Sequence, residues 1–102
     1  MKLIAGNALK LCRVRARIKQ QDVAKKMTLT PARIVALETS DKPVELELIE
    51  RYAKIIGVPV EVPILISIKE EDIHEAFRDD FKKMQITAYD YLVNLESKKK
   101  SR

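Results

Sequence analysis

The chain has 102 residues, 46% of them apolar, and a formal net charge of +5, as expected for one small globular domain. No apolar run approaches the roughly 20 residues that a bilayer-spanning helix needs, and the stretch from Met1 to Ala5 is too short for the apolar core of a secretory signal, so we expect a soluble cytoplasmic protein. The single cysteine excludes an internal disulfide, and with one histidine it leaves no zinc-ligand set, so we expect no metal or other cofactor.

The charge is unevenly distributed along the chain. Residues 1–42 hold ten Lys or Arg and three acids, whereas residues 43–102 hold ten Lys or Arg and twelve acids. A basic N-terminal part suits a polyanion, either nucleic acid or an anionic membrane surface, because Lys and Arg release counterions when they meet phosphates. Solubility of exposed helices explains the same charge equally well.

Three helices are predicted in the first 40 residues. The first follows from apolar residues at helical spacing, namely Ala5, Leu9, Cys12 and Ala16. A second covers about Gln20 to Met27 and stops at Thr28, where the apolar stripe ends. Thr30 is a favoured N-cap and proline is tolerated at the first helical position, so a third helix runs from Pro31 to about Glu38.

After a polar turn, a fourth helix is predicted from Val44, with Gly57 as its C-cap. The next segment changes periodicity, because every even position from Val58 to Ile68 is β-branched. This alternation predicts a β-strand over about 60–68. Pro59 and Pro63 lack backbone donors, so the strand would lie at an edge or in a two-stranded ribbon.

Two further helices are predicted in the C-terminal part. Ser67 and Glu70 have capping-box spacing ahead of a helix over about 69–84, and Thr87 with Asp90 repeats that spacing before another. The first of these helices carries an apolar stripe, formed by Ile73, Phe77, Phe81 and Met84. The stripe is interpreted as core, although it could also hold a partner protein.

Two short helices joined by a tight turn can place one helix in a DNA major groove while the other braces it. Three motifs point to a particular family of such proteins: Arg13 late in the first helix, the run from Gln20 to Ala24 in the second, and the run from Ile34 to Glu38 in the third. On these motifs, residues 9–58 closely resemble the phage repressor and Cro family, also called XRE-type. The expected fold is mainly α, a lambda-repressor-like domain of five to six helices with one C-terminal strand.

The resemblance also implies roles for individual residues. Arg13 would pair with Glu38 as a partly buried, structural ion pair, the alternative being two surface charges that never meet. Gln20 would contact a phosphate, and Thr39, Ser40 and Lys42 have the chemistry for phosphate contacts. The full set expected to contact DNA is Gln20, Gln21, Thr30, Pro31, Ala32, Arg33, Ala36, Thr39, Ser40 and Lys42.

This sequence departs from the family pattern at several positions. Pro31, Ala32 and Ala36 stand where many relatives carry bidentate polar side chains, so they can offer only apolar contact, for example with thymine methyls. Arg33 is the one long donor on the helix and would reach guanine or phosphate, or simply be solvated. Thr28 and Ser40 replace glycines of the family pattern, so both turns could differ in detail.

A dimer is expected because the predicted strand has no partner strand in the chain, and unpaired edges invite pairing with another molecule. A two-fold ribbon would be formed by Val60, Val62, Ile64, Ile66 and Ile68. The chain would then consist of a DNA-binding domain over residues 1–58 and an extension for dimerisation or partner binding over residues 59–102. Some apolar residues exceed a four-helix core and would face another layer of this chain or a second subunit: Leu11, Val14, Val35, Leu48 and Ile55.

The predicted function is therefore a sequence-specific regulator of transcription, most simply a repressor that binds a pseudo-palindromic operator in double-stranded DNA as a homodimer. One alternative is an antitoxin-like module that binds a protein through its C-terminal helices and autoregulates its operon. Another is an interaction domain that has lost DNA affinity. An enzyme is not expected, since two glycines cannot build a phosphate loop and Cys12 lies on a core face.

Overall fold

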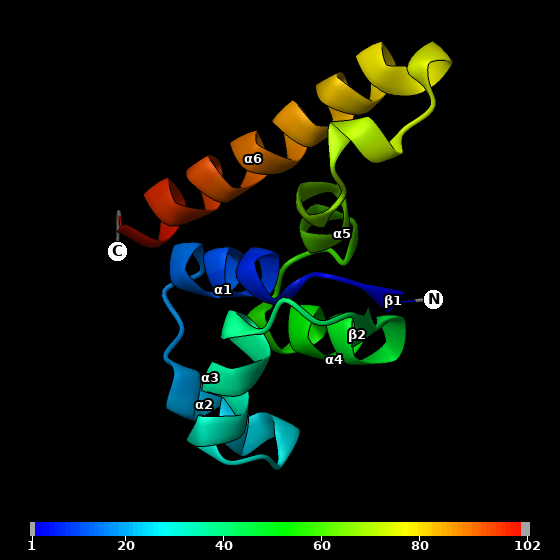
Figure 1. The fold of residues 1–102 in the computed structure, drawn as a ribbon. Helices are drawn as coiled ribbons and strands as arrows, with labels where there is room; N and C mark the ends of the chain where they lie inside the picture. Colours follow the sequence, from blue (N-terminus) through cyan, green and yellow to red (C-terminus); the bar gives the residue numbers. More distant parts are fainter. Residues whose placement is uncertain (1, 101–102) are drawn as a thin grey trace.

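The computed structural model describes residues 2–100, and the side chains of residues 3–97, as a mainly helical chain (Figure 1). Its elements are β1 (Lys2–Leu3), α1 (Gly6–Arg15), α2 (Gln20–Met27), α3 (Pro31–Thr39), β2 (Val44–Glu45), α4 (Leu46–Ile56), α5 (Glu61–Ser67), the 3-10 turns η1 (Glu70–Asp72) and η2 (Glu75–Phe77), and α6 (Arg78–Lys100). Within these residues, no helix has both the length and the apolar character needed to cross a bilayer.

α1 lies at the centre of the fold. It packs against α3 and α4 on one side and against α5 and α6 on the other (Figure 1). The four apolar positions predicted to face inward along this helix are all fully buried: Ala5, Leu9, Cys12 and Ala16. The helical stripe predicted from the sequence is therefore confirmed, and it forms the middle of the hydrophobic core.

The predicted helix boundaries of the N-terminal part are confirmed to within one or two residues. The hydroxyl oxygen of Thr30 accepts the backbone N–H of Arg33 at 3.2 Å, and Pro31 occupies the first turn, where its missing donor costs nothing. α4 ends at Gly57, whose φ of 76° lies in the left-handed region that glycine adopts without steric cost.

Thr28 and Ser40, which stand where the family pattern has glycine, adopt different backbone conformations. Thr28 ends α2 with φ 58°, a left-handed conformation that is unfavourable for a β-branched residue. Ser40 follows α3 with φ −73° and ψ 140°, an extended conformation open to any residue. Only the turn between α2 and α3 therefore carries backbone strain from the missing glycine.

The strand predicted over 60–68 is wrong, because this segment forms helix α5. Pro63 is the third residue of α5, so its missing N–H falls among the donors that a helix start leaves unpaired anyway. Leu65 is apolar although it stands at an odd position, so the alternation of apolar and polar residues is incomplete. In the helix, Val62 and Pro63 are buried, whereas the other β-branched residues of the segment are half-buried. Contact with α1 and α6 overrides the strand preference of the β-branched residues. The two-stranded ribbon between subunits therefore loses its basis.

The two helices predicted after residue 69 are also wrong in their boundaries. The acidic residues form the turns η1 and η2, and one helix, α6, then runs without a break through the expected gap. Thr87 does not cap a helix, since its hydroxyl donates to the carbonyl of Lys83 inside α6 at 3.0 Å. Of the predicted core stripe, Phe81 is buried, whereas Phe77 and Met84 are 63% and 53% exposed.

The inward face of α6 explains why the helix continues. Phe81, Ala88 and Leu92 are buried and lie seven and four residues apart, which keeps them on one face. Gln85 on the same side donates to the carbonyls of Leu65 and Ile68, at 3.0 and 3.2 Å, at the C-terminal end of α5. α6 is thereby attached to α5 and α1, on the side of α1 opposite α2 and α3 (Figure 1).

A short β-bridge, which the sequence did not predict, holds the N-terminal residues in place. β1 pairs with β2 antiparallel, with Leu3 opposite Val44. Val44 is buried and Leu3 is half-buried against the core. The bridge thus fixes the segment between α3 and α4 against the start of the chain.

Candidate nucleic-acid interface

α2, the turn at 28–30 and α3 form a compact pair of helices. Their inward residues are apolar and buried: Val23, Ala24, Met27 and Ile34. Because these side chains pack against α1 and α4, the pair is held as one unit whose opposite face remains at the surface.

The outer face of α3 is open to solvent. Pro31, Ala32, Arg33 and Ala36 are all exposed, as the resemblance implies for groove-facing residues. α6, the long C-terminal helix, lies beyond α1 and away from this face (Figure 1). The described part of the chain therefore leaves the small-residue face of α3 accessible to a second molecule.

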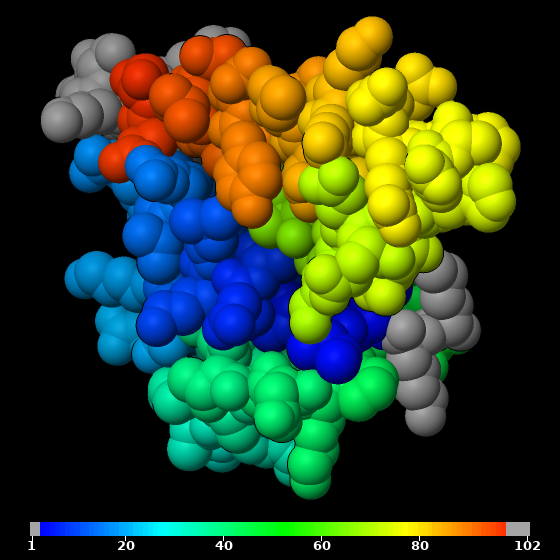
Figure 2. Space-filling view, turned by 45° about the horizontal axis from the view of Figure 1, so that its top comes forward, coloured from blue at the N-terminus to red at the C-terminus, as the bar shows by residue number. Residues whose placement is uncertain are grey.

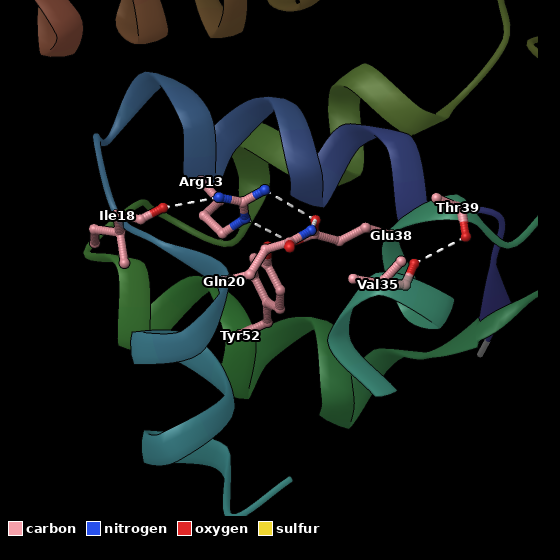
Figure 3. A network of polar contacts seen from close by, with 7 residues as sticks. All are labelled: Arg13, Ile18, Gln20, Val35, Glu38, Thr39 and Tyr52. Atoms are coloured by element: carbon pink, nitrogen blue, oxygen red, sulfur yellow. Dashed lines mark hydrogen bonds and ion pairs between the residues drawn. The ribbon is translucent and has the colours of Figure 1, made fainter. Parts of the chain in front are cut away.

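A buried polar network fixes the end of α3 (Figure 3). The guanidinium of Arg13 donates from Nε to Glu38 Oε2 at 2.7 Å and from Nη2 to Oε1 at 3.0 Å. Gln20 Nε2 donates to Glu38 Oε1 at 2.9 Å, and the hydroxyl of Tyr52 donates to Oε2. Arg13 Nη1 also donates to the carbonyl of Ile18 at 2.9 Å. Four elements, α1, α2, α3 and α4, are thus joined at one carboxylate.

The network holds its charges in fixed protonation states. Burial raises the pKa of Glu38, but donors from Arg13, Tyr52 and Gln20 outweigh that effect and hold the pKa below its ordinary value. The hydrogen bond to Glu38 raises the pKa of Arg13. Burial, then the neighbouring Glu38, raises the pKa of the Tyr52 hydroxyl. The group is therefore an ion pair with a neutral phenol, suited to positioning α3 rather than to proton transfer.

Sequence reasoning pointed to Arg13 and Glu38 but missed the two neutral members. Tyr52 follows the apolar spacing of α4, so helical periodicity alone gives it no polar role, although a buried tyrosine hydroxyl needs a partner. Gln20 had been given only a phosphate contact. In the structure its side chain is half-buried and its amide donates to Glu38, so it also supports the carboxylate.

The remaining residues of the predicted DNA-contacting set lie along the rim of the same surface. Gln21, Thr30 and Lys42 are exposed. The hydroxyl of Thr39 donates to the carbonyl of Val35 at 2.8 Å, and the Ser40 hydroxyl accepts the backbone N–H of Lys42 at 3.0 Å. The first of these bonds lies within the last turn of α3, and the second lies in the turn that follows α3.

A shallow hollow of about 420 Å³ adjoins α3. Its lining includes four residues of the predicted DNA-contacting set, Arg33, Ala36, Ser40 and Lys42, which come from α3 and the turn that follows. Apolar side chains line it as well, among them Leu29, Leu37 and Leu48. The structure thus places two cationic side chains beside apolar surface next to the exposed face of α3.

Among residues 2–100 no group of three His, Cys, Asp or Glu side chains is placed to hold a metal ion.

The family model described as helix-turn-helix matches residues 9–62, more than half of the chain. No curated protein and no solved structure matches the chain at a significant level.

Proposed function

Because the chain belongs to the helix-turn-helix family of the phage repressor and Cro type, whose members are DNA-binding transcription regulators, we propose that it is a repressor that binds a pseudo-palindromic operator as a dimer. The observation that carries the proposal is the exposed face of α3, held at its C-terminal end by the buried carboxylate of Glu38. A rigid, accessible helix of this kind can enter a major groove.

Base contacts are made by the small residues on the exposed face of α3. Pro31, Ala32 and Ala36 allow the helix backbone to approach the groove floor closely and present only apolar atoms, which favours thymine methyl groups. Arg33 lines the hollow beside α3 and reaches a guanine edge or a phosphate. The operator is therefore expected to be rich in A·T pairs, with one G·C pair in each half-site where Arg33 meets guanine.

Backbone contacts supply most of the affinity. Lys42, Thr39 and Ser40 flank the C-terminal end of α3, and Gln21 is exposed in the first turn of α2. Cations, hydroxyls and helix N-termini are suitable partners for phosphates without reading sequence. Two copies with α3 about 34 Å apart would meet successive major grooves on one side of the duplex.

Selection from a random pool of duplex DNA, followed by sequencing, tests this function. A two-fold symmetric consensus is expected, and its affinity should fall on the order of a thousandfold between 50 and 200 mM salt if about six phosphates are contacted. Replacement of Arg33 by Ala should weaken binding by about 1–3 kcal/mol and relax the preference at one position in each half-site.

The control for that replacement is Lys54→Ala, because Lys54 is also a long exposed cation but lies on α4 outside the DNA-contacting set. Its binding should equal that of the wild type. Absence of any salt-dependent DNA binding by the folded wild type would reject the regulator and favour an interaction domain that retains only the fold.

The antitoxin-like alternative has one observation in its favour, the apolar side chains left exposed on the C-terminal part, including Phe77 and Met84. Such side chains can be covered by a protein partner. Co-expression with the neighbouring reading frame, followed by purification through a tag on this chain, separates the alternatives. A stoichiometric small protein that dissociates when Phe77 is replaced by Glu would support the antitoxin-like role.

A further inference from the structure

Three exposed apolar side chains lie along one face of α6, and we name them the α6 stripe: Ile86, Tyr89 and Val93. Their exposed fractions are 59%, 43% and 54%. Spacings of three and four residues place them above one another on the helix surface. A row of exposed apolar side chains on one helix face loses free energy to water and can be covered by a partner.

The apolar surface extends beyond α6. Tyr89 lines a hollow of about 480 Å³ together with Ile4, Leu11 and Ile66, which come from the N-terminal segment, α1 and α5. Figure 2 shows this face, with α6 (orange) and the N-terminal part of the chain (blue) side by side and part of α5 (green) between them. A helix laid along the α6 stripe would also cover this hollow.

The charges at the two ends of the α6 stripe are opposite. Lys82 and Glu96 stand seven residues before and after Tyr89, and α-helical geometry keeps them within about 80° of the stripe residues. A two-fold axis near Tyr89 would therefore bring Lys82 of one copy opposite Glu96 of the other, and Ile86 opposite Val93. A parallel arrangement would instead oppose like charges.

We infer that a second copy of this chain packs its α6 antiparallel against the α6 stripe. This inference deepens the proposed function, on whose dimer it rests, by naming the surface that joins the two subunits. It replaces the strand pairing expected from the sequence, which α5 excludes.

The charged ends of the α6 stripe already form surface ion pairs within the subunit. Lys82 Nζ lies 3.0 Å from Glu70 Oε1, and Glu96 contacts Arg15 and Arg17. The side chains of Lys82 and Glu96 are nevertheless 52% and 32% exposed. Exposed ion pairs contribute little free energy, so these carboxylate and ammonium groups can be shared across the interface at low cost.

The α6 stripe and the DNA-contacting set have no residue in common. α1 lies between α6 and the α2–α3 pair (Figure 1). Both surfaces can therefore be occupied at the same time, as an operator-bound dimer requires.

Sedimentation velocity over a wide concentration range tests the interface with Val93→Glu. Two unpaired carboxylates would be buried in the dimer, so the dissociation constant should rise at least a hundredfold or so. Met84→Glu is the matched control, because Met84 is 53% exposed on the same helix but lies on its other flank. The inference is overturned if wild type is monomeric throughout, or if both variants dissociate equally.

Cross-linking tests the same geometry without adding a charge. It therefore still applies if the Val93→Glu variant does not fold. Mild oxidation of Tyr89→Cys is expected to yield a covalent dimer, because a two-fold axis near residue 89 brings the two thiols together. Burial raises the pKa of Cys12, the native thiol, to about 12 and keeps it unreactive. Met84→Cys should remain monomeric, and equal cross-linking of the two variants would contradict the inference.

DNA binding by the same proteins separates the two proposals. Val93→Glu should lose most of its preference for the symmetric site over a single half-site while retaining salt-dependent binding to the half-site. Full retention of the symmetric-site preference by a monomeric Val93→Glu would overturn the α6 interface and leave the regulator intact. A wild type that dimerises through α6 without binding DNA would reject the regulator alone.

Discussion

The helix-turn-helix part and the C-terminal part of this chain use polar and apolar side chains in opposite ways. In the first part, three side chains converge on the buried carboxylate of Glu38, and the surface helix α3 presents small residues. In the second, ion pairs such as Lys82–Glu70 lie at the surface, and five large apolar side chains remain exposed: Phe77, Met84, Ile86, Tyr89 and Val93.

The difference shows which part positions and which part associates. A buried, fully hydrogen-bonded group holds one geometry, because any other arrangement would leave a charge unpaired in a low dielectric. Half-exposed apolar side chains contribute little to the stability of the isolated subunit, but their burial against a partner stabilises the complex. We therefore expect substitutions in the buried polar network to change folding, and substitutions of the exposed apolar side chains on α6 to change assembly.

The largest effect on stability is expected for Arg13→Ala. It leaves the buried carboxylate of Glu38 without its cation, so the free energy of unfolding should fall by about 3–5 kcal/mol in a urea titration. Arg15→Ala, on the same helix, removes only a half-exposed pair with Glu96 and should cost less than about 1 kcal/mol. Equal losses for the two variants would remove the distinction between the buried network and the surface pairs.

Gln85→Ala tests whether the C-terminal part has a fixed attachment of its own. It removes the donor to the carbonyls of Leu65 and Ile68, so we expect a loss of about 1–2 kcal/mol in the free energy of unfolding. Gln21→Ala, on the exposed face of α2, is the control and should stay within about 0.5 kcal/mol of wild type. No difference between the variants would mean that α6 is held by apolar packing alone.

Acid should weaken the helix-turn-helix part through Glu38. Its pKa in the folded state lies below the ordinary value of 4.5, so its contribution to stability is present above pH 4.5 and is lost as the pH falls further. Glu38→Gln removes the carboxylate that takes up a proton on acid unfolding. Below pH 4.5 its free energy of unfolding should therefore fall less steeply with decreasing pH than that of wild type, by up to about 1.4 kcal/mol per pH unit. Parallel acid limbs, measured by urea titration at each pH, would show that Glu38 is not a determinant.

The smallest effect is expected at the turn between α2 and α3. Thr28→Gly relieves the left-handed strain at φ 58° and should raise the free energy of unfolding by about 1 kcal/mol. Ser40→Gly is the control, since an extended backbone gains nothing from glycine. Greater chain flexibility and the lost bond from Lys42 N–H should lower the free energy of unfolding by about 1 kcal/mol. Thermal unfolding of both variants checks the sign, and a loss at Thr28 would contradict the strain.

Local patterns were sufficient for the N-terminal helices. The spacing from Ala5 to Ala16, the cap at Thr30 and the glycine at position 57 each act within one helical turn, and all three were confirmed. The charge pair of Arg13 and Glu38 followed from the family resemblance. Its neutral members did not, because the approach of Gln20 and Tyr52 depends on how α2 and α4 cross α3.

Local patterns failed in the C-terminal part because they were compatible with more than one element. Prolines at positions 59 and 63 suit an edge strand, and Pro63 equally suits the first turn of a helix, while β-branched residues only weakly oppose a helix. Capping spacings at Ser67 and Thr87 likewise occur by chance inside helices, where both hydroxyls donate to carbonyls of their own helix.

By itself the amino-acid sequence determined the helix-turn-helix, its exposed small-residue face and the family to which the chain belongs, because periodicity, capping and motif spacing are properties of neighbouring residues. Tertiary structure alone decided that residues 61–67 are helical, that α6 is continuous and that its flank from Ile86 to Val93 is left uncovered. Those choices depend on which apolar surface of α1 the later segments cover, and that is a long-range packing energy.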